Sequence, residues 1–233
     1  METVLAVQGY RDAGAEISTD STIGDGARVF GRSRIEHSHV GIATTLNGPL
    51  KLTASTLGAR CLVGPDTVLA NVTGSDYITI GPGVNAINSN IGSGVIFTQQ
   101  SRVFDSTFAS NVVLLDNVVC EESNVMDSTL IEEGSHLVGV SVGSHSFVGG
   151  SSVLRSGTVV GDRVRVGRRC IIGHNVTIGA GSVLLDYVTV DDDVIIGDDV
   201  LVCSNTTIGD HAVVRAGYRV PASLVLQPYS ELG

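Results

Sequence analysis

The sequence has no tryptophan, and phenylalanine and tyrosine are scarce, since aromatic residues make up only 4% of its 233 residues. A chain of this length is able to bury a sizeable core, so aliphatic side chains must fill it. The N-terminus lacks a basic segment followed by an apolar one, and no apolar run approaches the length that crosses a bilayer. The sequence therefore predicts a cytoplasmic protein without membrane contact.

Basic residues are also few, because 14 Lys and Arg stand against 24 Asp and Glu and give a formal net charge of −10. An acidic chain is poorly suited to nucleic acid, whose phosphates must be neutralised. The four cysteines (Cys61, Cys120, Cys170 and Cys203) are far apart, with no CxxC pair and no histidine cluster around them. We therefore expect no disulfide and no metal site, with Cys61 and Cys170 as buried filler.

What the sequence has in abundance is a six-residue repeat. A large apolar residue recurs without a gap at Leu154, Val160, Val166, Ile172, Ile178, Leu184, Val190, Ile196, Val202, Ile208, Val214, Val220 and Leu226. Six residues is not the helical period, but it is typical of a solenoid whose short strands each place one large residue inward before the chain turns. A second inward position four residues later is mostly small or branched, as at Val164 and Cys170.

This pattern resembles the hexapeptide-repeat family. The resemblance implies an all-β fold, a left-handed parallel β-helix of triangular coils with three hexads in each coil. The handedness rests on the resemblance alone, because general sheet chirality favours right-handed crossovers.

The repeats predict one elongated domain over residues 1–233. Residues 1–16 show no period and are expected to cap the open end of the solenoid, whose hexads begin at Ile17. The register is lost over residues 40–49, which predicts a loop that protrudes from the prism. Val113, Val119 and Val125 keep the six-residue spacing and are expected to point inward. The tail at residues 221–233 is expected to leave the last coil and cover its end.

Several outward positions are apolar where a solvated solenoid would be polar. Ile171, Ile195 and Leu201 are examples, and contiguous apolar ladders of this kind usually mark an interface. The alternative is that β-propensity alone favours Val and Ile there. Members of the family are generally homotrimers of parallel prisms, so the resemblance implies a homotrimer.

One histidine stands out among six. His174 lies in the segment Gly173-His174-Asn175-Val176-Thr177-Ile178-Gly179, which looks like the His-(Asp/Asn)-x-x-(Ile/Val)-Gly motif of hexapeptide acyltransferases that act on nucleotide sugars. The resemblance implies that His174 is a general base and that Asn175 binds substrate. The alternative is that His174 is an ordinary turn residue facing solvent.

Coil stacking supplies a partner for His174. With about 18 residues per coil, residues one coil apart stack at roughly 4.8 Å, the spacing between strands. Asp192 follows His174 by one such coil, and a carboxylate near an imidazole fixes its tautomer and stabilises the imidazolium. The sequence therefore predicts Asp192 as the residue that orients His174. His37 and His39, next to the expected loop, are reserve candidates for the base.

Arginines cluster near the motif. Arg155, Arg168 and Arg169 are expected to bind substrate, because guanidinium groups suit the phosphates of a nucleotide or of coenzyme A. The alternative is internal pairing, with Arg168 stacked over Asp186 in a surface ion pair.

These observations predict an acyltransferase. It moves an acyl group from a coenzyme A or acyl-carrier thioester, its co-substrate, to an amine or hydroxyl of a sugar or nucleotide-sugar, and has no bound cofactor. A zinc enzyme of the gamma carbonic anhydrase type is disfavoured, because Val166-Gly167-Arg168 lacks the required histidine. The alternative is a non-catalytic β-helix that scaffolds or regulates a sugar nucleotidyltransferase.

Overall fold

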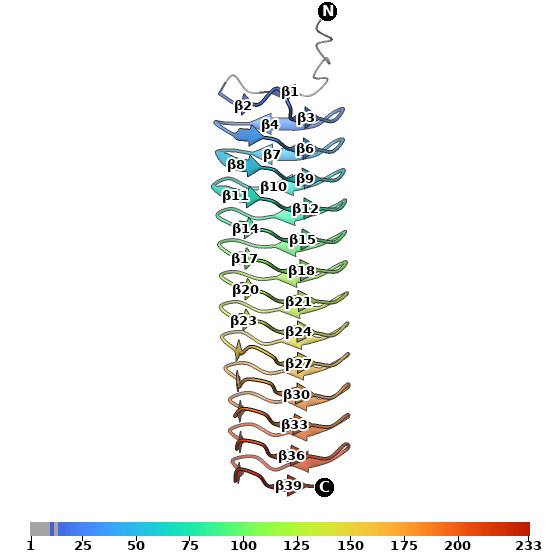
Figure 1. Ribbon diagram of the computed structural model, residues 1–233, viewed down its shortest axis with the longest axis vertical. Coiled ribbons are helices and arrows are strands. Elements are labelled where there is room, and N and C mark those ends of the chain that lie inside the picture. The colour runs from blue at the N-terminus through green and yellow to red at the C-terminus, as the bar shows by residue number, and fades with distance from the viewer. Residues whose placement is uncertain (1–9, 12–13) are drawn as a thin grey trace, which may run out of the picture.

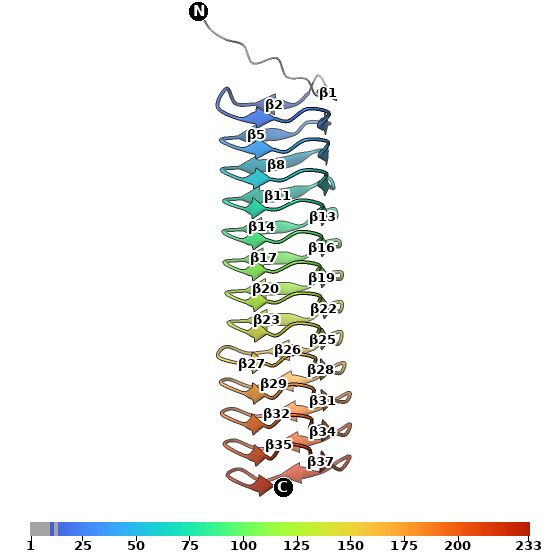
Figure 2. The same ribbon diagram turned by 90° about the vertical axis from the view of Figure 1, so that its right-hand side faces the viewer.

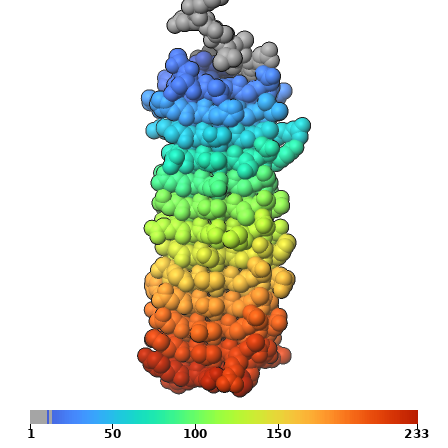
Figure 3. All heavy atoms as spheres, turned by 45° about the vertical axis from the view of Figure 1, so that its right-hand side comes forward, coloured from blue at the N-terminus to red at the C-terminus, as the bar shows by residue number. Residues whose placement is uncertain are grey.

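The computed structural model describes residues 10–11 and 14–233, and these residues wind into a single column of short strands (Figure 1). Every third strand joins the same sheet, which gives three parallel sheets of 13 strands, called sheets A, B and C here. Figure 2 shows the same stack from the side, and Figure 3 shows the successive coils as bands of a column. No helix occurs in the described part of the chain, so nothing there crosses a membrane as a helix.

The strands are two to four residues long. Sheet A contains β1 (Tyr10–Arg11), β4 (Arg28–Phe30), β7 (Thr45–Asn47), β10 (Leu62–Val63), β13 (Thr79–Ile80), β16 (Ile96–Phe97), β19 (Val113–Leu114), β22 (Leu130–Ile131), β25 (Phe147–Val148), β28 (Arg165–Val166), β31 (Val183–Leu184), β34 (Leu201–Val202) and β37 (Arg219–Val220). Sheet B contains β2 (Glu16–Ile17), β5 (Arg34–Glu36), β8 (Leu50–Thr53), β11 (Thr67–Ala70), β14 (Asn85–Ile87), β17 (Arg102–Phe104), β20 (Val119–Glu121), β23 (His136–Val138), β26 (Val153–Leu154), β29 (Ile171–Ile172), β32 (Thr189–Val190), β35 (Thr207–Ile208) and β38 (Val225–Leu226). Sheet C contains β3 (Thr22–Ile23), β6 (His39–Val40), β9 (Thr56–Leu57), β12 (Thr73–Gly74), β15 (Asn90–Ile91), β18 (Thr107–Phe108), β21 (Asn124–Val125), β24 (Ser141–Val142), β27 (Val159–Val160), β30 (Thr177–Ile178), β33 (Ile195–Ile196), β36 (Val213–Val214) and β39 (Glu231–Leu232).

The core is a continuous aliphatic column along the axis. Every large residue predicted to point inward from Leu154 to Leu226 is buried, and Leu226, in the last coil, is the most exposed of them at 8%. Two aromatic rings enter the column, Phe97 and Phe108, which pack edge to face with centroids 5.0 Å apart. From Leu154 to Leu226 the inward pattern predicted from the sequence is therefore confirmed.

The coils come in two lengths that differ by one residue. In the middle of the column Leu62 pairs with Thr79, which defines the short coil, whereas Arg165 in the last part pairs with Val183, which defines the long coil. The missing residue of the short coil always falls in the turn from sheet B to sheet C. Seven of these turns are short, at residues 36–39, 53–56, 70–73, 87–90, 104–107, 121–124 and 138–141. We call the whole row of turns between sheets B and C the B–C edge.

The short turns correct two expectations from the sequence. Residues 40–49 do not form a protruding loop, because β6 and β7 pair with strands on both sides and Val40 and Leu46 are fully buried. Because each short turn lacks one residue, the next inward residue comes after five positions instead of six. In the sequence this shift looks like an interruption of the repeat. Val113 and Val119 accordingly point outward, while their neighbours Leu114 and Cys120 are fully buried.

The two ends also differ from the expectation. Residues 221–233 do not leave the solenoid, because β38 pairs with β35 and β39 pairs with β36 to complete a last coil. At the other end, β1 already pairs with β4 and β2 with β5, so paired strands start before Ile17. Residues 1–9 and 12–13 of the predicted cap lie outside the described residues.

Buried serines stabilise the short turns. Ser106 is a clear case, since its hydroxyl donates a hydrogen bond to the carbonyl oxygen of Phe104 (2.7 Å) and accepts one from the backbone N–H of Ser123 (3.1 Å). The same arrangement recurs in other short turns, at Ser38, Ser55 and Ser123. The hydroxyl thus satisfies a buried backbone N–H of the next coil, as the hydroxyls of Ser146, Ser152 and Ser182 do in full-length turns.

We predict that Ser106→Ala lowers the free energy of unfolding by about 1–3 kcal/mol, because it leaves the N–H of Ser123 buried without an acceptor. Urea unfolding, together with hydrogen exchange at the Ser123 amide, measures the effect. Ser93→Ala, at an exposed turn position where no side-chain hydrogen bond is lost, is the matched control. Equal stability of the two variants would contradict the role given to the serine row.

Candidate functional site

His174 lies on the B–C edge, in the turn between β29 and β30, with its side chain exposed. Its Nδ1 atom is 2.9 Å from the hydroxyl of Ser156, which occupies the equivalent turn position one coil earlier. Nε2 makes no hydrogen bond within the part of the chain that the structure describes. Ser156, rather than a carboxylate, therefore orients the ring. The sequence reasoning missed this partner, although coil stacking could have found it by looking one coil before His174 as well as one coil after.

Asp192 is next to His174, as the stacking predicted, but it contacts a different atom. Its Oδ1 accepts the backbone N–H of His174 at 2.7 Å, so the expected carboxylate–imidazole hydrogen bond does not form. The physical reason is Gly173: a Cβ there would lie 2.4 Å from this oxygen, and the absent side chain lets the carboxylate approach the backbone. The same cap recurs at Asp76, Asp162, Asp186 and Asp198, each accepting one backbone N–H, so it is a general feature of the turns.

Beside His174 runs a second row of turn residues, each with a positive φ. Asn175 donates its Nδ2 hydrogen to Oδ1 of Asp193 (3.1 Å), and Oδ2 of Asp193 is 3.7 Å from Nε2 of His211. The ring of His211 stacks on Tyr229 with centroids 4.7 Å apart. Asn175, which the sequence predicts to bind substrate, is therefore held next to His174 by this row of interacting side chains. Asp193 and His211 were not singled out by the sequence reasoning, although steps of one coil relate all four residues of the row.

The three predicted arginines do not converge. Arg155 is on the B–C edge directly before Ser156. Burial, and after it the charges of Asp210 and Asp192, raise the pKa of the nearby Asp191 carboxyl, and the Arg155 guanidinium opposes this rise. Arg168 and Arg169 lie in the turn between sheets A and B, on another edge of the prism. Only Arg155 shares the edge of His174.

Arg168 and Arg169 already have partners. Two nitrogens of Arg168 donate to the carboxylate of Glu132, at 2.7 and 3.0 Å, and this hydrogen bonding lowers the pKa of Glu132. The expected partner Asp186 instead accepts the backbone N–H of Arg168 (2.8 Å). Arg169 donates to the hydroxyl of Tyr187 (2.6 Å). Internal pairing, the alternative interpretation, therefore accounts for the Arg168 guanidinium, with Glu132 as its partner.

The reserve histidines form a separate cluster in the first coils of the B–C edge. Nδ1 of His37 contacts Oδ2 of Asp20, and Ser18 donates to the other oxygen of the same carboxylate. Both hydrogen bonds lower the pKa of Asp20, and the one from Ser18 has the larger effect. His39 contacts the hydroxyl of Thr22 through its own Nδ1. The imidazole–carboxylate pair expected at His174 thus occurs at His37.

Other reactive groups in the described residues are unsuited to chemistry. All four cysteines are buried and unpaired, and burial raises the pKa of Cys120 to about 12 and that of Cys170 to about 11, so these thiols stay protonated and are poor nucleophiles. Within the described ranges, no three His, Cys, Asp or Glu side chains are placed to hold a metal ion.

Among the hollows on the surface of the described residues, two lie in the first half of the column. One, of about 600 Å³, lies on the first coils beside Arg32 and Arg34. The other, of about 380 Å³, lies on the B–C edge and is lined by Asn71, Thr73, Asn88, Ser89, Asn90, Asp105, Ser106 and Thr107. Neither includes the turn of His174, so acid–base chemistry at this exposed imidazole needs a second surface to exclude water.

Comparison with known protein families identifies part of the six-residue repeat. The family model described as "Hexapeptide repeat of succinyl-transferase" matches residues 139–168, and this repeat implies that the β-helix is left-handed. No curated protein matches the sequence.

Among solved structures, the chain is similar to UDP-N-acetylglucosamine acyltransferases from three organisms. The protein of Francisella novicida is 17% identical over 95% of this chain and 65% of its own, with a TM-score of 0.30. That of Campylobacter jejuni is 14% identical over 71% and 65%, with a TM-score of 0.32, and that of Arabidopsis 16% over 94% and 69%, with a TM-score of 0.29. The chain thus spans 65% of the length of the first two.

We predict that the ion pair of Glu132 makes stability depend on pH. Because Arg168 lowers the pKa of Glu132 in the folded state, the pair stabilises the fold above the carboxyl's unfolded pKa and is lost as the pH falls through the folded value. The melting temperature of the unaltered protein should therefore fall more steeply below about pH 4.5 than that of Glu132→Gln. Glu133→Gln, an exposed neighbour, is the charge-matched control, and identical pH profiles for all three proteins would refute the prediction.

Proposed function

We propose that this chain, which belongs to the hexapeptide-repeat transferase family, is an acyltransferase with His174 as its general base. It moves an acyl group from a coenzyme A or acyl-carrier thioester to an amine or hydroxyl of a sugar or nucleotide-sugar. The observation that carries the proposal is an exposed imidazole, within the motif Gly173–Gly179, whose Nδ1 is fixed by Ser156 while Nε2 is left unpaired by the described residues.

The chemistry follows from the hydrogen bond to Ser156. When Nδ1–H donates to the Ser156 hydroxyl, Nε2 carries the lone pair and accepts a proton from the acceptor amine or hydroxyl. The deprotonated acceptor attacks the thioester carbonyl, a new C–N or C–O bond forms, and the C–S bond breaks. The imidazolium then returns its proton to the departing thiolate, so no acyl-enzyme is required.

We assign Asn175, which Asp193 holds beside His174, to hydrogen-bonding the acceptor. Arg155 is the arginine on this edge that we assign to substrate phosphate. Arg168 and Arg169 serve such a role only from a neighbouring prism, since they lie on a different edge.

We further propose a homotrimer of parallel prisms. The apolar outward residues lie on three different sheets: Ile171 (43% exposed) on sheet B, Ile195 (51%) and Val159 (48%) on sheet C, and Leu201 on sheet A. Val159 and Ile195 occupy the strands on either side of β30, directly after the His174 turn. A neighbour packed on this face would bury apolar surface and would also supply the wall that His174 lacks.

We predict that His174→Ala lowers turnover by about two to four orders of magnitude, because it deletes the base. The fold should persist, with a change in stability below about 1 kcal/mol for an exposed turn residue. Ser156→Ala and Asp192→Asn should lower turnover less, since the first frees the ring and the second alters the backbone cap. A thermal-shift screen of thioesters and nucleotide sugars identifies the substrates, and steady-state rates then measure the effect.

His145→Ala, at an exposed turn on the edge between sheets C and A, is the control and should leave turnover unchanged. Full activity of His174→Ala would overturn the assignment and favour His37 with its partner Asp20. If no thioester or nucleotide sugar binds at all, the non-catalytic scaffold becomes the better explanation.

We predict that Ile195→Asp weakens the trimer, because association would bury an unpaired carboxylate. Sedimentation equilibrium at micromolar concentration should give a trimer mass for the unaltered protein and a smaller average mass for the variant. Ile42→Asp, at a similarly exposed position (55%) in a turn far from the His174 coils, controls for the substitution. A monomer mass for the unaltered protein would mean that the outward Val and Ile residues serve only strand formation.

A further inference from the structure

The hollow on the B–C edge belongs to a regular polar surface. In its turns, Asn71 donates a hydrogen bond to Asn88 (3.0 Å), and Asn88 donates to Asp105 (2.9 Å). These three residues occupy the same position in successive coils, so their polar groups repeat at roughly 4.8 Å along the axis. The amide row forms one wall of the hollow of about 380 Å³.

A second row runs beside the first, on the outward positions of sheet C. It consists of Thr56, Thr73, Asn90, Thr107 and Asn124, which pair coil to coil in register. Their side-chain hydroxyl and amide groups make no hydrogen bond within residues 14–233, and all of these residues but the half-buried Asn124 are exposed. In the long coils the same positions include Val159, Ile195 and Val213. The sheet therefore changes from a hydrogen-bonding face to an apolar one along its length.

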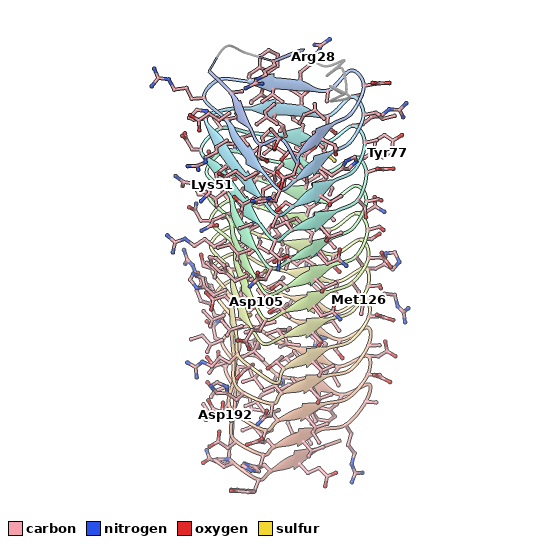
Figure 4. All side chains as sticks on the ribbon, turned by 45° about the horizontal axis from the view of Figure 1, so that its top comes forward. Arg28, Lys51, Tyr77, Asp105, Met126 and Asp192 are labelled. Carbon is pink, nitrogen blue, oxygen red and sulfur yellow. The ribbon has the colours of Figure 1, made fainter. Side chains whose placement is uncertain are left out.

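The charged residues of this edge are mostly acidic. In the short turns at residues 53–56, 70–73, 87–90, 104–107, 121–124 and 138–141, the charged residues are Asp105, Glu121 and Glu122. The coils that follow His174 in the sequence add Asp191, Asp192, Asp193 and Asp210 to the same edge. The single arginine in the turns of this edge is Arg155. Away from Arg155, such a surface attracts cations. Figure 4 labels Asp105 and Asp192, one residue from each part of this edge.

The hollow and His174 lie on one line. Asp105, Glu122, Gly139, Gly157 and Asn175 hold equivalent positions in successive turns of the edge, so Asp105 and Asn175 are four coils apart, or about 19 Å at the strand spacing. A ligand a few sugar units long that lies along the edge would therefore reach from the hollow to His174.

We propose that the acyl acceptor is an oligosaccharide of amino sugars with free primary amines, bound lengthwise along the B–C edge. Its hydroxyls pair with the unpartnered threonine and asparagine row, and its ammonium groups face the carboxylates. The inference rests on the proposed function for the transfer step. There, an amine that has lost its proton to His174 attacks the thioester carbonyl, an amide C–N bond forms, the C–S bond breaks, and the thiolate takes up the proton.

Binding is tested without an acyl donor, by calorimetric titration of the full chain with β-1,4-linked glucosamine oligomers of one to six units. The N-acetylated oligomers of the same lengths are the comparison ligands. We expect the glucosamine hexamer to bind at least about tenfold more tightly than the dimer and than the N-acetylated hexamer. The affinity should also fall as salt screens the carboxylates.

The double variant Asn90→Ala with Thr107→Ala should weaken binding of the hexamer by about tenfold, because it removes two adjacent hydrogen-bonding groups. The matched control is Thr189→Ala with Thr207→Ala, on the outward positions of sheet B in neighbouring long coils, and it should bind as the unaltered protein does. Circular dichroism verifies that both double variants remain folded.

Three results would overturn the inference: a hexamer that binds no better than the monomer, equal affinity for the N-acetylated hexamer, or an equal loss in the control variant. If His174-dependent transfer to a single nucleotide-sugar is then observed, the proposed function stands without this inference. Length-dependent binding of the amine oligomers without any transfer would support the glycan site and contradict the proposed function instead.

Discussion

The backbone ladder along the solenoid axis is the interaction on which everything else depends. Each coil donates its N–H groups to the carbonyls of the next, as in the bonds from His39 to Ser55 and from Val183 to Val200, both 2.8 Å. This ladder fixes the distance between coils at one strand spacing. Residues one coil apart therefore share the same environment, and each side chain must be compatible with the equivalent side chains in the coils before and after it. The buried aliphatic column, the glycines that admit a carboxylate cap and the polar rows on the edges all follow from this stacking.

The two coil lengths show how the ladder accommodates a shorter turn. In the short turns between sheets B and C a buried backbone N–H is accepted by a serine hydroxyl of the preceding coil, as at Ser38, Ser55 and Ser106. Full-length turns use the same device at Ser146, Ser152 and Ser182, whereas Thr158 in a long B–C turn donates to the carbonyl oxygen of Gly173 (2.8 Å). The short and long coils thus divide one continuous fold into parts with different surfaces, polar on sheet C in the first and largely apolar in the second.

The sequence predicted the part of the fold in which one period holds throughout. From Leu154 to Leu226 the large inward residues are identified correctly, because the spacing is constant and a single template fits. The prediction of a loop at residues 40–49 is wrong. Each short coil lacks one residue, which interrupts the six-residue spacing, and the interruption looks like a loop unless one notices that it recurs in every short coil. Val113 was chosen over Leu114 because both are apolar, and only the pairing of the ladder decides which one faces inward. At the candidate site, stacking brought Asp192 correctly beside His174. It could not show which atom the carboxylate would reach, since that depends on the space above Gly173.

The position of His174 on an edge rather than inside the prism limits how it is able to work. The interior is filled mainly by aliphatic side chains, so the exposed polar groups available for chemistry lie on the turns and at the outward positions of the strands. An exposed turn holds a ring in place by its neighbours along the axis, as Ser156 does, but it cannot exclude water from both sides of a substrate. Two surfaces of this protein are suited to complete such a site: a ligand that lies along the edge, and a second prism packed on the apolar part of sheet C next to the turn. The two are compatible, because the apolar residues Val159 and Ile195 lie beside His174 while the hydrogen-bonding row begins in the short coils. The step in coil length therefore separates a surface suited to subunit contact from one suited to binding substrate.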